Sequence, residues 1–174
     1  MVGTDMKRNI YLIGFMGVGK STIGKLLAKE MEGQLVEMDE TIEAEQGISI
    51  NEIFAKYGET HFRDLESELV KRIAGGEGNI ISCGGGAVLR AENVDNMKKS
   101  GQIVFLSATP ETIYQRVRYS ANRPLLNGNM NVEYIAGLME KRRALYESAA
   151  DLMISTDGKT QNAIVEEILS KCNE

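Results

Sequence analysis

The stretch Gly14-Phe15-Met16-Gly17-Val18-Gly19-Lys20-Ser21 matches the phosphate-binding pattern G-x-x-x-x-G-K-[ST]. It lies between an apolar run at 10–13, typical of a buried strand, and a segment at 21–31 whose apolar residues recur at the spacing of one helix face. The glycines let successive backbone N–H groups curl around a phosphate, and the helix adds the partial positive charge of its N-terminus. We therefore expect the chain to bind a nucleoside triphosphate, with Lys20 at the β- and γ-phosphates and Ser21 on Mg²⁺.

Composition narrows the class of protein further. The chain has 174 residues, 43% of them hydrophobic, which is enough for one globular domain with a substantial core. Its net charge of −5 argues against a nucleic-acid binder, which needs a basic face. Cys83 and Cys172 are too far apart in sequence to indicate a disulfide framework or a metal site. The sequence shows neither an apolar segment long enough to span a membrane nor a targeting signal. We therefore expect a cytoplasmic protein, and we expect it to be a monomer.

Short apolar segments alternate with helical patterns along the chain. The segments that read as strands are 10–14, 35–38, 79–83, 103–106 and 152–155. Strands that alternate with helices predict a parallel sheet covered by helices on both faces. Ligands of such sheets bind beyond the carboxyl ends of the strands, so the residues that follow each strand are the candidates for a site.

Three segments between the predicted strands carry unusual residues. After the second strand, Asp39 precedes two consecutive helical patterns that form an insertion at about 39–75, in which Ser49 to Glu52 reads as a capping box and Gly58 ends the first helix. After the third strand, Gly84–Gly86 offers bare backbone to a ligand. The irregular stretch at about 118–131 is rich in turn residues and is predicted to be a lid.

Three charged side chains are candidates for ligand binding, and each has a plainer alternative. Arg142 falls inside the apolar stripe of a helix at about 132–149, where it needs an anion, an internal ion pair or a route to solvent. Arg63 can pair with Glu66 three residues later, either as a surface salt bridge or as a fork held in place for the carboxylate or hydroxyls of a small substrate. Asp39 either accepts the proton of a substrate hydroxyl or caps a helix that starts at Glu40.

Together, these motifs resemble those of the shikimate kinases. The resemblance runs from about residue 10 to 168 and rests on the P-loop, Asp39, Ile48–Phe54, Phe62-Arg63, Gly84–Gly86, Arg123-Pro124-Leu125-Leu126 and Arg142. It implies a single α/β domain over 1–174 with three α/β/α layers, the P-loop kinase fold and a five-stranded parallel sheet of order 2-3-1-4-5. It also implies phosphorylation of the 3-hydroxyl of shikimate by ATP, on the route to chorismate and the aromatic amino acids.

The resemblance further implies a role for individual residues. Catalytic roles fall to Lys20, Asp39 and Arg123. Shikimate would be bound by Asp39, Arg63, Gly84, Gly85, Gly86 and Arg142. ATP would be bound by Gly14, Gly17, Val18, Gly19, Lys20, Ser21, Thr22, Arg116 and Arg123. One Mg²⁺ ion would be held by Ser21, with support through water from position 37.

Two positions depart from the family pattern. Glu37 stands where the family usually has an aspartate, and its extra methylene is compatible with a water-mediated contact to Mg²⁺. Asp157-Gly158-Lys159 stands near the adenine, where some members carry an arginine. A lysine does not stack on a base as a guanidinium does, which makes the adenine contacts hard to predict.

Two other functions fit parts of the sequence. A kinase of another small hydroxy-acid, such as gluconate, shares the P-loop and also needs carboxylate-binding arginines. A nucleotide-dependent switch shares the P-loop as well, but the guanine-reading sequence Asn-Lys-x-Asp does not occur in this chain. Release of ADP with different acceptors distinguishes the three.

Overall fold

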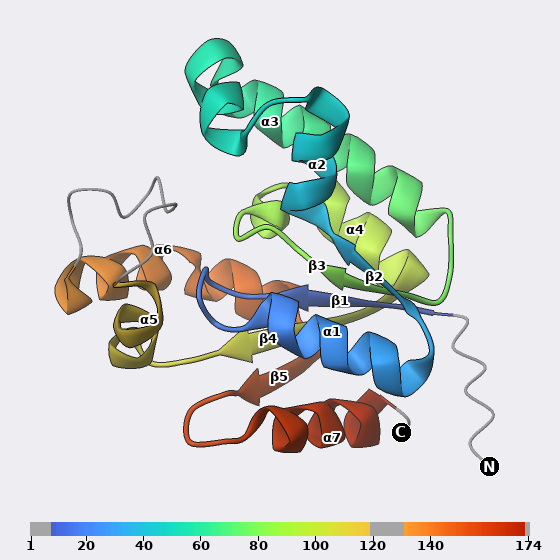
Figure 1. The fold of residues 1–174 in the computed structure, drawn as a ribbon, viewed down its shortest axis with the longest axis vertical. Helices are drawn as coiled ribbons and strands as arrows, with labels where there is room; N and C mark the ends of the chain where they lie inside the picture. The colour runs from blue at the N-terminus through green and yellow to red at the C-terminus, as the bar shows by residue number, and fades with distance from the viewer. Residues whose placement is uncertain (1–7, 119–130, 173–174) are drawn as a thin grey trace.

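Five parallel strands form one sheet in the computed structural model, which describes residues 8–118 and 131–172 (Figure 1). The strands are β1 (Asn9–Ile13), β2 (Gln34–Glu37), β3 (Asn79–Ser82), β4 (Gly101–Ser107) and β5 (Leu152–Ser155). Their order across the sheet is β2-β3-β1-β4-β5, which confirms the predicted topology. Each connection between consecutive strands contains at least one helix, as parallel pairing requires.

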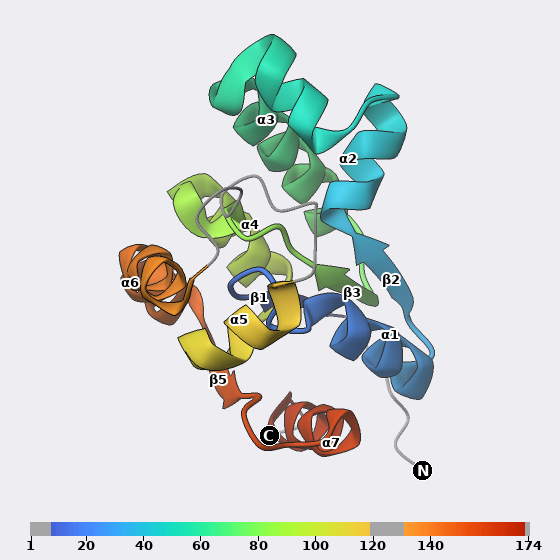
Figure 2. The ribbon, with the colours of Figure 1, turned by 60° about the vertical axis from the view of Figure 1, so that its left-hand side comes forward.

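Helices cover both faces of the sheet (Figure 2). The helices α1 (Lys20–Met31) and α7 (Gln161–Cys172) pack on one face, and α3 (Ile50–Ala74), α4 (Ala91–Ser100) and the second half of α6 (Val132–Ala149) pack on the other. All of β1 is buried, and its successive side chains pack against helices on opposite faces of the sheet. Leu12 packs toward α1, and Tyr11 packs toward α3 and α4. This sandwich fixes the carboxyl edge of the sheet, where the candidate residues were predicted to meet.

The strands lie where the apolar segments predicted them, with ends shifted by at most two residues. One shift matters for the site. Met38 was predicted to end the second strand, but it is the first residue of α2 (Met38–Gln46). The chain enters the helix at once because Glu37 has extended backbone angles as N-cap and its carbonyl accepts a hydrogen bond from Thr41 Oγ1 at 2.8 Å. Asp39 therefore lies in the first turn of α2 and is not a helix cap.

The predicted insertion at 39–75 folds as α2 and α3, which lie at the top of Figure 1, and the second half of α3 reaches the face of the sheet. Ser49 caps α3 by accepting a hydrogen bond from the Glu52 amide at 3.1 Å, as the capping box predicted. Gly58 has a φ of +86° and kinks the helix where the first helical pattern was predicted to end. Arg72 forms two hydrogen bonds with Glu45, at 2.7 and 2.8 Å, and so ties α3 to α2.

Two short helices complete the carboxyl edge. They are the 3₁₀ helix η1 (Ala87–Leu89), directly after the glycine triplet, and α5 (Pro110–Val117), which begins after β4. The predicted lid at about 118–131, with Arg123, lies outside the described residues except at its two ends. None of the described helices is long and apolar enough to cross a membrane.

Candidate active site

The P-loop joins β1 to α1 and wraps around the N-terminus of that helix. Gly14, Gly17 and Gly19 have φ values of +147°, +80° and +106°, which L side chains rarely adopt. A Cβ on Gly14 would collide with the Leu106 carbonyl oxygen of β4. The glycines of the motif are thus required by the turn itself, and the turn presents the amino end of α1 to a ligand.

Lys20 reaches back across the loop that precedes it. Its Nζ donates hydrogen bonds to the carbonyl oxygens of Gly14, at 2.6 Å, and Phe15, at 3.2 Å. These two contacts keep the ammonium group over the mouth of the loop. Arg116, on α5, braces the same loop from the other side by donating to the carbonyl oxygens of Gly17, at 3.2 Å, and Val18, at 2.9 Å.

Ser21 and Glu37 meet at the floor of this region. Ser21 Oγ donates a hydrogen bond to Glu37 Oε2 at 2.9 Å and lies 3.5 Å from Ser82 Oγ at the end of β3. The other carboxylate oxygen, Glu37 Oε1, is buried and has no hydrogen-bond partner within the described part of the chain. A hydroxyl next to an unsatisfied carboxylate oxygen is a donor set that suits a hard divalent cation.

A pocket of about 480 Å³ lies in front of these groups. Its walls include the P-loop, Thr22, Glu37, Asp39, Arg116 and, at the far side, Thr156 and Lys159. Lys159 forms an ion pair with Glu167 of α7 at 2.8 Å, so its ammonium group is held at the rim. The residues predicted to bind ATP within the described chain therefore line one cavity or brace its wall.

A second pocket, of about 710 Å³, adjoins the first. It lies between α2, α3, the glycine triplet and α6, and its lining includes Arg63, Glu66 and Arg142 together with the apolar rings of Phe54 and Phe62. Asp39, Met16, Gly84 and Gly85 line both pockets. Asp39 thus stands at the junction of the two cavities.

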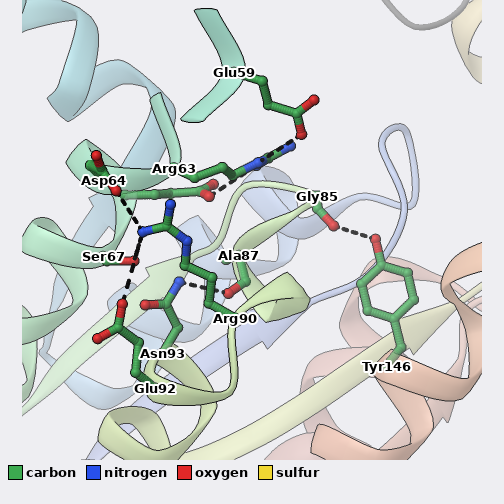
Figure 3. A network of polar contacts seen from close by, with 11 residues as sticks. Glu59, Arg63, Asp64, Ser67, Gly85, Ala87, Arg90, Glu92, Asn93 and Tyr146 are labelled. Carbon is green, nitrogen blue, oxygen red and sulfur yellow. Dashed lines mark hydrogen bonds and ion pairs between the residues drawn. The ribbon is translucent and has the colours of Figure 1, made fainter. Parts of the chain in front are cut away.

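The guanidinium of Arg63 is held by two carboxylates of its own helix. Its Nη1 lies 2.9 Å from Glu66 Oε1 and its Nε lies 3.3 Å from Glu59 Oε2 (Figure 3). The side chain of Arg63 is 12% exposed and that of Glu66 is 1% exposed, so this is not the surface salt bridge that the sequence left open. Burial raises the pKa of the Glu66 carboxyl, and the Arg63 guanidinium offsets part of that effect.

The glycine triplet is surrounded by these charged groups. A Cβ on Gly84 would lie 2.8 Å from both Asp39 Oδ1 and Glu66 Oε2, and one on Gly86 would overlap the guanidinium of Arg63. A Cβ on Gly85 would lie 3.2 Å from Arg142 Nη1. The triplet consists of glycines because a side chain at any of its positions would meet a charged group. These groups belong to Asp39, Glu66, Arg63 and Arg142.

Arg142 is half-buried on α6, with its guanidinium against Gly85, which agrees with the inward direction that the helical pattern predicted. The segment that follows the triplet is fastened to α3 and α4. Arg90 forms an ion pair with Asp64 at 2.8 Å, and the buried Asn93 donates a hydrogen bond to the Ala87 carbonyl oxygen at 3.0 Å (Figure 3). These contacts set the position of the glycine loop relative to Arg63.

Sequence reasoning missed one residue of this site. Tyr146 was assigned only to the apolar stripe of α6, but its hydroxyl donates a hydrogen bond to the Gly85 carbonyl oxygen at 2.5 Å. The available signal was its spacing of four residues from Arg142, which places both side chains on one face of the helix.

Comparison with known proteins gives a consistent family. The family model for shikimate kinase matches residues 16–173. Shikimate kinases of Thermodesulfovibrio yellowstonii and Persephonella marina are each 44% identical over 164 residues, which are 94% of this chain and 94% and 98% of theirs.

Solved structures agree with the sequence comparison. A shikimate kinase from Acinetobacter baumannii, in complex with shikimate, superposes with a TM-score of 0.91 at 32% identity over 97% of this chain and 94% of that one. A gluconokinase from Sinorhizobium meliloti shares the fold, with a TM-score of 0.61, but is only 18% identical over 97% of this chain and 93% of its own. On the fold, the order of the motifs and these relatives, the chain belongs to the shikimate kinase family.

Proposed function

We propose that the two adjoining pockets hold the two substrates of a shikimate kinase, ATP in the P-loop pocket and shikimate in the pocket between α3 and α6. The chain is an enzyme of this family, and the reaction converts ATP and shikimate to ADP and shikimate 3-phosphate. The main support for assigning one substrate to each pocket is the position of Asp39, which lines both pockets. A phosphoryl donor and its acceptor hydroxyl need such a meeting point.

On the ATP side, we assign the phosphates to the P-loop. The loop residues from Met16 to Gly19 and the amino end of α1 line the pocket that would hold the phosphates. Lys20 now donates to two carbonyl oxygens, and phosphate oxygens would replace these acceptors when the nucleotide binds. Arg116 supports the loop at its rim and lies where the adenine is expected, while Lys159 occupies the opposite rim.

Members of the family use ATP with a divalent cation, and we assign Mg²⁺ to Ser21 and Glu37. The fit rests on the hydroxyl of Ser21 and on the buried, unsatisfied Oε1 of Glu37 beside it. Once bound, the cation supplies positive charge that neutralises the β- and γ-phosphates. Glu37 reaches the serine hydroxyl directly, so its extra methylene does not remove it from the site.

On the shikimate side, charge complementarity sets the orientation. Arg63 and Arg142 offer two guanidinium groups for the substrate carboxylate, and a planar fork binds a carboxylate with two parallel hydrogen bonds. Asp39 and the backbone of the glycine triplet face the hydroxyl groups. The rings of Phe54 and Phe62 form the apolar wall for the carbon ring of the substrate.

Asp39 then acts at the reacting hydroxyl. It orients this hydroxyl toward the γ-phosphorus and accepts its proton as the new O–P bond forms and the bond to the ADP oxygen breaks. Its place in the first turn of α2, near the end of β2, brings the carboxylate next to the P-loop pocket. Positioning supplies most of the catalysis in such a transfer.

Three further assignments remain proposals. The insertion at 39–75, folded as α2 and α3, acts as the substrate-binding region, and the segment at about 118–131 acts as the lid that brings Arg123 to the phosphates. The active unit is a cytoplasmic monomer that needs neither nucleic acid nor membrane.

The activity is tested by following ADP release by the purified protein with MgATP and one acceptor at a time. We expect rapid release with shikimate and only background release with gluconate, with nucleoside monophosphates or with no acceptor. Turnover with gluconate equal to that with shikimate, or none with shikimate, would contradict the proposed function.

A further inference from the structure

Tyr146 connects α6 to the glycine loop across a large separation in sequence. The tyrosine is 3% exposed, and its ring stacks on Phe105 of β4 with centroids 5.1 Å apart and planes at 28°. Its hydroxyl donates a hydrogen bond to the Gly85 carbonyl oxygen at 2.5 Å, as Figure 3 shows. The stacked ring fixes the direction of the hydroxyl, so the bond holds Gly85 to the sheet side of the loop.

Each carbonyl oxygen of the glycine triplet accepts a hydrogen bond. The Gly84 oxygen accepts from the Ala87 amide at 3.0 Å and the Gly86 oxygen accepts from the Leu89 amide at 3.0 Å. These two bonds come from the following 3₁₀ turn, whereas the bond to the middle carbonyl comes from the side chain of Tyr146. The peptide between Gly85 and Gly86 therefore depends on a residue from a different helix.

Fixing this carbonyl also fixes the amide on the other side of the same peptide. In a planar trans peptide the C=O group and the following N–H group point in opposite directions. With the Gly85 oxygen directed at Tyr146, the Gly86 N–H points away from it. A flip of this peptide, which glycines permit at little steric cost, would turn the amide the other way and expose a carbonyl in its place.

Tyr146 also lies against Arg142. The two residues are one helical turn apart on α6, and both the hydroxyl of Tyr146 and the Nη1 of Arg142 lie within 4 Å of the Cβ position of Gly85. Burial raises the pKa of the Tyr146 hydroxyl, and the neighbouring Arg142 guanidinium offsets part of this. The phenol thus stays protonated at neutral pH and remains a donor.

We propose that Tyr146 is a positioning residue that sets the Gly85–Gly86 peptide and Arg142 in the orientation that shikimate needs. This inference rests on the proposed function, since it concerns the pocket assigned to shikimate. Tyr146 itself does not line either pocket and acts through the groups that do.

The test is Tyr146→Phe, which keeps the stacked ring and removes only the hydroxyl. Tyr11→Phe is the matched control, because Tyr11 is fully buried and its hydroxyl bonds to Ser100 Oγ at 2.6 Å, away from both pockets. We expect Tyr146→Phe to raise the KM for shikimate about tenfold while the KM for ATP changes less than twofold, consistent with loss of roughly one hydrogen bond. Each of the two variants loses one buried hydroxyl, so we expect them to lower Tm by similar amounts. Tyr11→Phe should leave the KM values for shikimate and ATP unchanged.

An unchanged KM for shikimate in Tyr146→Phe would overturn the proposal, and so would equal rises in the KM values for shikimate and ATP. Wild-type activity with shikimate is measured first, so a failure of the proposed function is seen separately. A second measurement needs no variant: in protein labelled with ¹⁵N-glycine, shikimate should shift the Gly86 amide signal. A Gly86 signal that does not move on saturation with shikimate would also overturn the proposal.

Discussion

Ser21 and Glu37 are joined by a hydrogen bond of 2.9 Å from the serine hydroxyl to one carboxylate oxygen, while the other oxygen is buried without a partner in the described chain. The bond links the first turn of α1 to the end of β2, the two elements that flank the P-loop pocket. An unsatisfied buried oxygen costs free energy, so its presence beside a phosphate-binding loop points to a positively charged ligand.

Glu37→Gln should therefore weaken the response to Mg²⁺ and leave the protein folded. The glutamine keeps the size of the side chain but removes the negative charge that would face the cation. We expect the Mg²⁺ concentration for half-maximal activity to rise about 10- to 100-fold. Binding of Mn²⁺ to the ADP-bound protein, followed by electron paramagnetic resonance, gives a readout apart from activity. Glu40→Gln, an exposed change on α2, is the control, and equal Mg²⁺ curves for both variants would contradict the assignment.

Asp39→Asn tests the proposed proton acceptor. The amide preserves shape and cannot take up a proton, so kcat should fall by about 100-fold or more, whereas Tm changes little. Glu40→Gln again serves as control, because it removes a neighbouring first-turn carboxylate with the same effect on the helix dipole. A near-normal kcat in Asp39→Asn would contradict proton transfer to Asp39 and would mean that this residue only binds the substrate.

Arg63→Ala and Arg142→Ala should weaken shikimate binding far more than ATP binding. Each loses a charge-assisted contact, expected to cost about 1.5–3 kcal/mol, or about 10- to 150-fold in affinity. Arg143→Ala, whose side chain is 61% exposed and pairs with Glu140, is the matched control and should behave as wild type. Calorimetric titration with each ligand separates the effects. Equal losses for ATP and shikimate would indicate a structural role.

Glu66→Gln should separate stability from function. Burial raises the pKa of this carboxyl above its usual value of 4.5, so the folded state holds the proton more tightly than the unfolded state does. The stability that this group contributes is therefore present at low pH and is lost as pH rises through the raised pKa. We expect Glu66→Gln to match wild type in Tm near pH 4.5 and to equal or exceed it at neutral pH.

The same variant should bind shikimate less tightly, because Arg63 loses its buried, charged partner. Glu59→Gln is the control, since Glu59 contacts the same guanidinium from a position that is 60% exposed. A Tm of Glu66→Gln that falls below wild type as pH rises would contradict the direction of the pKa shift.

Much of this site could be predicted because its determinants are local in sequence. The P-loop is a contiguous motif, the strands are short apolar runs, and the kink at Gly58 follows from a glycine that breaks a helical pattern. The inward direction of the Arg142 side chain could be predicted from helical periodicity alone, because Arg142 interrupts an apolar stripe. The resemblance to a family then supplied the order of strands in the sheet, which periodicity does not encode.

The parts that could not be predicted depend on contacts between distant segments. Nothing in the pattern indicates that Asp39 and Glu66 approach the same glycine, or that the hydroxyl of Tyr146 holds Gly85. The boundary between β2 and α2 was missed for a different reason. An apolar residue directly after an apolar run is interpreted as part of the strand, but Met38 is the first residue of α2 and is fully buried. Arg123 and the proposed lid stay predictions from sequence.

Gly84→Ala is the sharpest test of how closely the site is packed. The φ of Gly84 is not in the left-handed region, so alanine is compatible with the backbone, and the unfolded state would lose entropy in favour of folding. The new methyl group, however, would lie 2.8 Å from both Asp39 Oδ1 and Glu66 Oε2. Neither carboxylate can stay in place at that distance, so Asp39 must shift together with Glu66 to admit the methyl group.

We therefore expect Gly84→Ala to fold with a Tm near that of wild type and to lose at least about tenfold in kcat, since a displacement of about 1 Å at a reacting group can cost that much or more. Gly137→Ala is the matched control: Gly137 lies in α6, nothing lies within 4 Å of its Cβ position, and alanine there should stabilise the helix by about 0.5–1 kcal/mol. Its kcat should be unchanged. A Gly84→Ala enzyme with normal kcat would mean that Asp39 tolerates displacement, which is incompatible with its role at the reacting hydroxyl.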